Sequence, residues 1–243
     1  MSNFTNLPAT IEIYRNIKNS PWSYFHLDQR QRQIAEDIRN GKAGALLISE
    51  LEPVITLGRR TPQDDILLGE PALNEMGIGV YRTDRGGLAT YHGPGQWVLF
   101  PVERLETLTG DRKGVRQAVG TLLEIAYCVG RNYDKKVEIR SGSQLGVWTQ
   151  KGKFASVGVH IEQGVLFHGL SVNGFKTPLS FQGLRPCGLD AQMDYLLESP
   201  SEDEFQGLQQ ALISETLRRF WGRKITHPTQ EALTATADAI ITH

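Results

Sequence analysis

The chain of 243 residues is long enough for one large domain that buries its core without covalent crosslinks. It carries 26 basic and 27 acidic side chains, a formal net charge of −1 and no block of either sign, so we expect no general affinity for nucleic acid or anionic membranes. Its two cysteines fit a reducing compartment, and it contains neither a signal-peptide pattern nor a run of about eighteen apolar residues. We therefore expect a soluble cytoplasmic protein that forms a single domain over residues 1–243.

The first part of the sequence predicts one helix followed by short strands. Ser20 and Pro21 are typical of a helix start, and apolar side chains then recur on one helical face until Asn40 and Gly41. Short apolar runs bounded by glycine, glutamate or proline predict buried strands after this helix. The strands expected here cover residues 43–49, 53–57, 78–83 and 97–102.

A second helix is expected to begin near Asp111, which can cap it, and to end at Gly130. Cys128 lies on the apolar stripe of this helix, and we expect its thiol to be buried and inert. After the helix the pattern changes to alternating runs separated by short glycine-containing breaks, as in hairpins. The strands expected in this region cover residues 136–141, 145–150, 153–162 and 165–173.

The C-terminal part predicts two more helices. Ser201 and Glu204 form a capping box, and apolar residues continue at helical spacing to about residue 221. Pro228 is expected to open a final helix. Helices interrupted by runs of strands, rather than a regular alternation of the two, favour an α+β fold with an antiparallel or mixed sheet.

A glycine-rich segment, RGGLATYHGPGQ at 85–96, joins two of the predicted strands. Glycine inside a helix or strand costs roughly 0.5–1 kcal/mol in backbone entropy, so four glycines so close together indicate positive φ angles or a close approach of the backbone to a ligand. We expect a binding loop rather than a core element, with a wide surface turn as the alternative. The polar side chains that this loop offers to a ligand are Arg85, Thr90, Tyr91, His92 and Gln96.

Cys187 and Lys153 are the side chains whose positions suggest chemistry. Cys187 stands between Pro186 and Gly188 without helical or strand periodicity, which favours a positioned thiol, with Arg185 as a nearby cation. Lys153 opens a strand of small and apolar residues, so its ammonium is able to reach a pocket and favour a nearby thiolate. The alternatives are a buried, inert cysteine and a solvated surface lysine.

Two histidines, His92 and His168, are candidates either for a role in the site or for hydrogen bonds within the framework. No third ligand stands at metal spacing beside them, so we expect no zinc site. The sequence also lacks a GxxxxGK[ST] phosphate-binding loop.

Taken together, these motifs resemble the lipoyl (octanoyl) transferase family, known as LipB. The resemblance covers residues 46–190 and includes Phe154, where isoleucine is commoner, and His160, where many members carry arginine. The motifs that carry the resemblance are EPVITLGRR at 52–60, RGGLATYHGPGQ at 85–96, GVW followed by KFASVG at 146–158, LFHGLSVN at 166–173 and RPCGL at 185–189.

The resemblance implies transfer of an octanoyl group from octanoyl-acyl carrier protein to a specific lysine of a lipoyl domain. Cys187 would be the nucleophile that forms an acyl-thioester, and Lys153 would lower the pKa of this thiol and carry protons. His168 would support the site. Further residues implied to line the substrate site are Arg85, Gly86, Gly87, Leu88, Ala89, Thr90, Tyr91, His92, Ser156, Val157, Gly158, Gly169, Leu170 and Ser171.

By the same resemblance, the acceptors would be lipoyl domains of the E2 subunits of 2-oxoacid dehydrogenases and the glycine-cleavage H protein. No cofactor is needed, because a thioester is already activated. The implied fold is that of biotin and lipoate protein ligases, an α+β arrangement of a larger mixed sheet and a smaller sheet with helices around them. Because acyl carrier proteins and lipoyl domains are often acidic, arginines near the site are candidate docking contacts. These arginines are Arg59, Arg60, Arg82 and Arg85.

Two other functions remain open at this stage. An ATP-dependent lipoate or octanoate ligase on the same fold would activate a free acid and would not require Cys187. A catalytically silent carrier-binding module would be expected to have lost Cys187 or Lys153, and both are present.

Overall fold

Two mixed β-sheets form the framework in the computed structural model, which describes residues 11–15, 20–62, 65–134, 136–184 and 192–222. The large sheet has the order β1-β2-β6-β10-β9-β8-β7 and the small one the order β4-β3-β5. β1 is parallel to β2 and β3 is parallel to β4, whereas the other pairs are antiparallel. The large-sheet strands are β1 (Glu12–Arg15), β2 (Ala45–Ser49), β6 (Gln96–Arg104), β7 (Glu138–Arg140), β8 (Gly146–Trp148), β9 (Lys153–Glu162) and β10 (Val165–Asn173), and the small-sheet strands are β3 (Val54–Leu57), β4 (Gly79–Arg82) and β5 (Thr90–His92).

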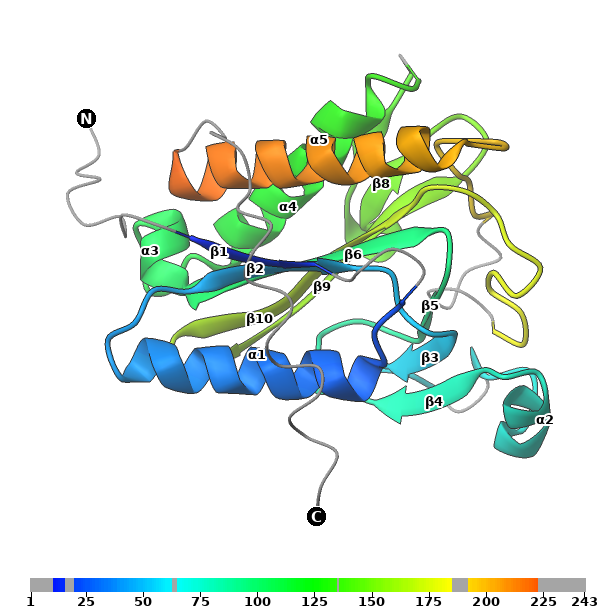
Figure 1. Cartoon of the computed structure of the whole chain (residues 1–243), viewed down its shortest axis with the longest axis horizontal. Helices are drawn as coiled ribbons and strands as arrows, with labels where there is room; N and C mark the ends of the chain where they lie inside the picture. The colour runs from blue at the N-terminus through cyan, green and yellow to red at the C-terminus, as the bar shows by residue number, and fades with distance from the viewer. Residues whose placement is uncertain (1–10, 16–19, 63–64, 135, 185–191, 223–243) are drawn as a thin grey trace.

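Helices cover both faces of the large sheet (Figure 1). α4 and α5 lie on one face and α1 on the other, while α2 lies beside the small sheet. Side chains alternate between the faces, so Leu46 and Ile48 of β2 pack toward α4 and α5, whereas Leu47 packs toward α1. The described helices are α1 (Tyr24–Arg39), α2 (Glu70–Glu75), α3 (Leu105–Thr109), α4 (Val115–Gly130), α5 (Glu202–Trp221) and the 3-10 turn η2 (Gly142–Gln144).

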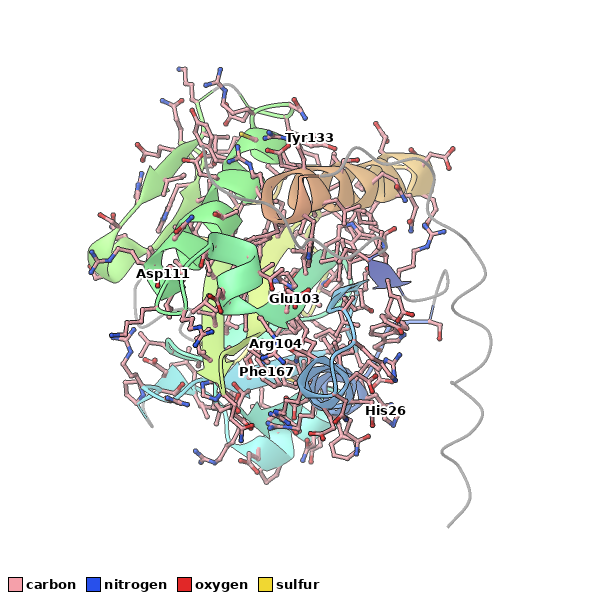
Figure 2. The ribbon with its side chains drawn as sticks, turned by 90° about the vertical axis from the view of Figure 1, so that its left-hand side faces the viewer. His26, Glu103, Arg104, Asp111, Tyr133 and Phe167 are labelled. Atoms are coloured by element: carbon pink, nitrogen blue, oxygen red, sulfur yellow. The ribbon has the colours of Figure 1, made fainter. Side chains whose placement is uncertain are left out.

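Figure 2 shows a side view in which buried side chains of the large sheet can be compared with exposed ones on the helices. Phe167 of β10 lies near α1, seen end-on, and is buried, whereas His26 of that helix is exposed. Glu103, at the end of β6, is also buried, and its carboxylate accepts hydrogen bonds from the backbone N–H groups of Gly44 and Arg104 at 3.1 and 2.8 Å. Burial raises the pKa of Glu103, and these bonds satisfy the carboxylate.

Two of the predicted helix starts need correction. α1 begins at Tyr24 rather than near Pro21, because the Ser23 hydroxyl accepts the His26 N–H and caps the helix there. α4 begins at Val115, capped by Gly114 without a side-chain bond, and Asp111 instead accepts the Lys113 N–H in the preceding turn.

The C-terminal predictions have different outcomes. The capping box of Ser201 and Glu204 at the start of α5 is confirmed, and this helix ends at Trp221. Cys128 in α4 is only partly buried, and the Arg219 guanidinium donates to its sulfur at 3.1 Å, so the prediction of a fully buried thiol is wrong. The helix predicted to begin at Pro228 lies outside the described residues.

The glycine-rich segment also contains a core element that the sequence did not suggest. Thr90–His92 form β5, which pairs antiparallel with β3 and is buried. The many glycines around this strand predicted a loop. The strand is defined by its pairing with β3, which is distant in the sequence, so no local pattern indicates it. The segment is therefore a loop that ends in a strand of the small sheet.

The pairing between β10 and β6 is interrupted opposite Pro101. Register runs from Val165 to Leu166 and resumes only at Leu170, so Pro101 faces His168 in the unpaired stretch. Proline has no N–H to donate to the ladder. His168 adopts a φ of 60° there, and its own N–H donates to the Gln31 side chain of α1 at 2.6 Å.

The residues that the structure describes include no helix with the length and apolar character needed to cross a membrane.

Candidate active site

A cavity of about 450 Å³ lies between the glycine-rich segment, β9 and β10. All the residues that the sequence placed at the substrate site line it except Tyr91. Tyr91 alternates with Thr90 and His92 along β5, so its ring points to the other side, where it packs 5.5 Å from Phe181. Arg60, which the sequence suggested as a docking contact near the site, also lines it. The lining residues that sequence reasoning missed are Phe100, Gly142, Ser143 and Leu145.

Arg85 holds the glycine-rich loop in shape. Its guanidinium donates to the carbonyl of Thr56 at 2.7 Å, to the hydroxyl of the same residue at 2.8 Å, and to the carbonyls of Gly86 and Leu88 at 3.1 and 2.8 Å. Only 7% of Arg85 is exposed. Arg85 is therefore ruled out as a contact for a docking protein, although part of it borders the cavity.

A chain of buried amides fixes the imidazole of His92. The Gln96 amide nitrogen donates to the Tyr91 carbonyl and to Asn173 Oδ1 at 3.3 and 2.9 Å, so Gln96 Oε1 is left to accept from His92 Nδ1 at 2.6 Å. This arrangement places the proton on Nδ1 and leaves Nε2 as an acceptor. Burial, followed by the positive charge of Arg85, lowers the His92 pKa to about 3, so the ring is neutral at physiological pH.

His168 joins β10 to the start of the glycine-rich segment. Its Nε2 lies 2.7 Å from Asp84 Oδ1, and its Nδ1 lies 3.3 Å from the Tyr24 hydroxyl. The hydrogen bond from His168 holds the pKa of Asp84 well below its usual range. Sequence reasoning missed Asp84, whose only signal was an acidic residue directly before the conspicuous Arg85.

Lys153 is buried rather than solvated, with 3% of its surface exposed, and it lines the cavity. Its ammonium donates to the Leu145 carbonyl at 2.7 Å. Its backbone pairs with the segment that follows residue 191: the Lys153 N–H donates to the Gln192 carbonyl, and the Asp194 N–H donates to the Lys153 carbonyl, both at 2.9 Å.

Cys187 lies outside the described residues, within the segment 185–191. Both flanks of that segment are anchored. Leu184 forms an antiparallel bridge with Ile66 on one side, and Met193 forms a parallel bridge with Lys153 on the other. The second bridge places the chain around Met193 directly beside Lys153 at the start of β9.

A network of charges surrounds Asp84, whose hydrogen-bond partner His168 lines the cavity. Among the described residues, Asp84, His160 and Glu162 come close enough to share a metal ion, their ligand atoms lying within 4.8 Å of one another. Guanidinium groups already occupy this cluster: Arg32 lies 3.3 Å from Asp84 and 3.8 Å from Glu162, and Arg59 donates to His160 Nδ1 at 2.8 Å. The arrangement favours an ion-pair network over a metal site.

Comparison with known proteins identifies the chain. Residues 23–215 match the model of the lipoyl protein ligase A/B catalytic domain. An octanoyltransferase of Magnetococcus marinus is 36% identical over 181 residues, which cover 74% of this chain and 78% of that relative. The chain belongs to this octanoyltransferase family. Its membership makes it an acyltransferase, as the sequence predicted.

Other octanoyltransferases are also similar in sequence, and more distantly related proteins share the fold. The octanoyltransferase of Acidobacterium capsulatum is 32% identical over 208 residues, covering 81% of this chain and 84% of its own. The mitochondrial octanoyltransferase LIP2 of Arabidopsis thaliana is 30% identical, covering 75% of each chain. Two solved structures share the fold at low identity: P. falciparum LipL1 in complex with lipoate (TM-score 0.58, 12% identity, 92% of this chain and 64% of that one) and lipoate-protein ligase A bound with ATP (TM-score 0.55, 13% identity, 86% and 85%). The predicted ligase-like α+β fold of this octanoyltransferase is therefore confirmed.

Proposed function

We propose that this octanoyltransferase moves an octanoyl group from octanoyl-acyl carrier protein to a lysine of a lipoyl domain, through a thioester on Cys187. The observation that carries the proposal is the buried Lys153, which lines the cavity and pairs through its backbone with the anchored flank of the Cys187 segment. A buried lysine at the wall of a cavity is a candidate for a catalytic role.

The cavity suits an aliphatic chain. Leu88, Val157 and Leu170 supply apolar lining, and burial of the chain would contribute about 0.8 kcal/mol for each CH₂ group. Glycines 86, 87, 158 and 169 also line it, so backbone atoms approach the bound group closely at these positions.

In the loading step, the Cys187 thiolate attacks the carbonyl carbon of the donor thioester. A new carbon–sulfur bond forms, the bond to the pantetheine sulfur breaks, and the Lys153 ammonium gives its proton to the departing thiolate. In the second step, the neutral amine of the acceptor lysine attacks the acyl-cysteine. Its carbon–nitrogen bond replaces the bond to Cys187, and Lys153 takes the proton that the amine loses, which restores the starting pair.

The partners follow from this chemistry and remain part of the proposal. The donor is octanoyl-acyl carrier protein, and the acceptors are lipoyl domains of E2 subunits and the glycine-cleavage H protein, in the cytoplasm. No ATP is required. The exposed Arg59, Arg60 and Arg82 provide positive charge near the cavity for acidic carriers, and Arg60 itself borders the cavity.

Intact mass spectrometry tests the proposal. Purified protein mixed with octanoyl-acyl carrier protein, without an acceptor, is expected to gain one octanoyl group that hydroxylamine removes. Cys187→Ser should abolish the gain and Cys128→Ser, at the other cysteine, should leave it unchanged. An adduct that persists in Cys187→Ser would contradict the assigned nucleophile. Absence of any adduct, together with acceptor modification that needs ATP and free octanoate, would instead establish the ligase reaction.

A further inference from the structure

Gly146 lies directly against the side chain of Lys153. A Cβ atom on Gly146 would stand 2.2 Å from Lys153 Cε, 3.0 Å from its Nζ and 2.6 Å from the Ala155 carbonyl oxygen. Atoms in proteins essentially never approach a Cβ atom as closely as 2.2 Å, so the methylene stem of Lys153 fills the space that any side chain at this position would need.

Leu145 and Trp148, close to Gly146 in the chain, also lie near the Lys153 ammonium. The Leu145 carbonyl accepts a hydrogen bond from Nζ at 2.7 Å, and Nζ lies 6.0 Å from the centre of the Trp148 ring. The Trp148 indole N–H donates to the Gln144 carbonyl at 2.9 Å, which ties the strand to the preceding turn.

The pairing of β8 with β9 is irregular at the same place. Val147 is opposite Ala155, but Trp148 is opposite Lys153, so β9 has one residue more than β8 between these pairs. Such a bulge redirects side chains at the edge of a site. Lys153 thus leaves its strand at the bulge and crosses the bare Cα of Gly146 to reach the Leu145 carbonyl.

We propose that Gly146 is a positioning residue for the acyl transfer: the absence of a side chain there lets Lys153 reach the Leu145 carbonyl and places its ammonium at the cavity. This inference rests on the proposed function, in which Lys153 is the proton partner of Cys187. Gly146 acts through Lys153 and does not itself contact the reacting groups.

The backbone of Gly146 requires a control. Its φ of 152° is unfavourable for other residues, so alanine would also strain the chain. Gly164, in the turn between β9 and β10, has a φ of 80° with no atom within 4 Å of the position of a Cβ. Gly164→Ala therefore imposes backbone strain without touching Lys153.

The test measures the thiol of Cys187 directly. In a Cys128→Ser background, Cys187 is the only thiol, and its alkylation by iodoacetamide is followed against pH for the parent, Gly146→Ala, Lys153→Ala, the double variant and Gly164→Ala. We expect Lys153→Ala to move the midpoint upward by about one pH unit, which slows alkylation at neutral pH by about tenfold. Gly146→Ala should move it in the same direction, the double variant should match Lys153→Ala, and Gly164→Ala should match the parent.

The possible failures are distinguishable. If Lys153→Ala leaves the profile unchanged, the cysteine–lysine pair of the proposed function is wrong, and the inference about Gly146 falls with it. If Lys153→Ala shifts the profile but Gly146→Ala follows the parent, the inference alone is overturned.

Thermal unfolding of the parent, the Gly146→Ala and Lys153→Ala single variants and the double variant keeps the test decisive if Gly146→Ala folds poorly. Lys153→Ala removes Cε, so Gly146→Ala should lower the melting temperature less in the Lys153→Ala background than in the parent. An equal loss in both backgrounds would assign the cost to the backbone and to the Ala155 carbonyl, and would overturn the inference.

Discussion

Hydrogen bonds around the cavity fix the protonation and orientation of single side chains, and His92 is an example. Its proton is assigned to Nδ1 by the orientation of Gln96, which is fixed in turn by the Tyr91 carbonyl and Asn173. With a pKa of about 3 the ring is a poor proton acceptor at neutral pH, so proton transfer in the proposed reaction belongs to Lys153 instead. The buried neutral state of His92 nevertheless has a consequence for stability.

Replacing His92 with asparagine is expected to make the fold less sensitive to acid. The folded protein lowers the His92 pKa from 6.5 to about 3, so between these values the unfolded chain binds a proton that the folded chain excludes. The free energy of unfolding therefore falls as the pH falls through this window, by up to about 1.4 kcal/mol per pH unit from this group, and the contribution is constant above it. Urea unfolding at a series of pH values should give a shallower decline for His92→Asn.

Asparagine can still donate to Gln96 from the position of Nδ1, so the variant removes the titration and keeps the contact. His26→Asn makes the same substitution at an exposed position of α1, outside the cavity, and serves as the matched control. A His92→Asn curve parallel to that of the parent would show that His92 is not held neutral.

At the scale of elements, the interruption of the pairing between β10 and β6 lies at the wall of the cavity. Gly169 follows His168 in the stretch where β10 and β6 are unpaired, and a Cβ atom on it would stand 2.4 Å from the Leu99 carbonyl oxygen and 3.1 Å from Pro101 Cδ. Both neighbours belong to the backbone or ring of β6 and have little freedom to move. The glycine is thus required by the approach of two strands as well as by the cavity that it lines.

Gly169→Ala is therefore expected to destabilise the protein by about 1–3 kcal/mol, the usual cost of inserting a methyl group where there is no room. The matched control is Gly120→Ala in α4, where no atom lies within 4 Å of the position of a Cβ and alanine should stabilise the helix by about 0.5–1 kcal/mol. Chemical denaturation of both variants measures the difference. A Gly169→Ala protein as stable as the parent would mean that β6 and β10 separate easily.

The elements themselves were predictable where a local pattern defines them. β9 and β10 match the predicted 153–162 and 165–173, because alternating apolar residues and a short glycine turn mark each boundary. β5 was missed because its identity comes from pairing with β3, and β1 and α2 were missed because they are short. Local periodicity carries no information about such distant partners.

The same limit applies to the candidate site. Motifs brought out Lys153, His92, His168 and the glycine-rich loop, all of which lie at the cavity. Asp84, Thr56 and Gln31 were not recognisable, since each acquires its role only through a contact with a residue distant in the sequence. Sequence motifs bring out the residues proposed to carry the chemistry, and the fold adds those that hold them in place.

At the scale of the whole molecule, contacts between loops position the positive charges near the cavity. The backbone N–H groups of Arg59 and Arg60 donate to the carbonyls of Arg85 and Gly87 at 3.1 Å, so this arginine turn is fixed on the glycine-rich loop. Both side chains are exposed, and Arg60 borders the cavity. The turn therefore presents positive charge at the place where a carrier protein would deliver its acyl group.

Reversing this charge with Arg59→Glu and Arg60→Glu is expected to slow acyl loading from an acidic carrier by about tenfold at low salt, with a smaller effect at high salt, because steering by charge is screened. Rapid-quench measurement of acyl-enzyme formation gives the rate. Arg112→Glu with Lys113→Glu makes the same change of charge in the turn between α3 and α4, away from the small sheet (Figure 1), and should load at the parent rate. Loading that is unchanged at low salt in the Arg59 and Arg60 variant would remove this turn from the docking surface, whereas equal slowing in both double variants would attribute the effect to net charge alone.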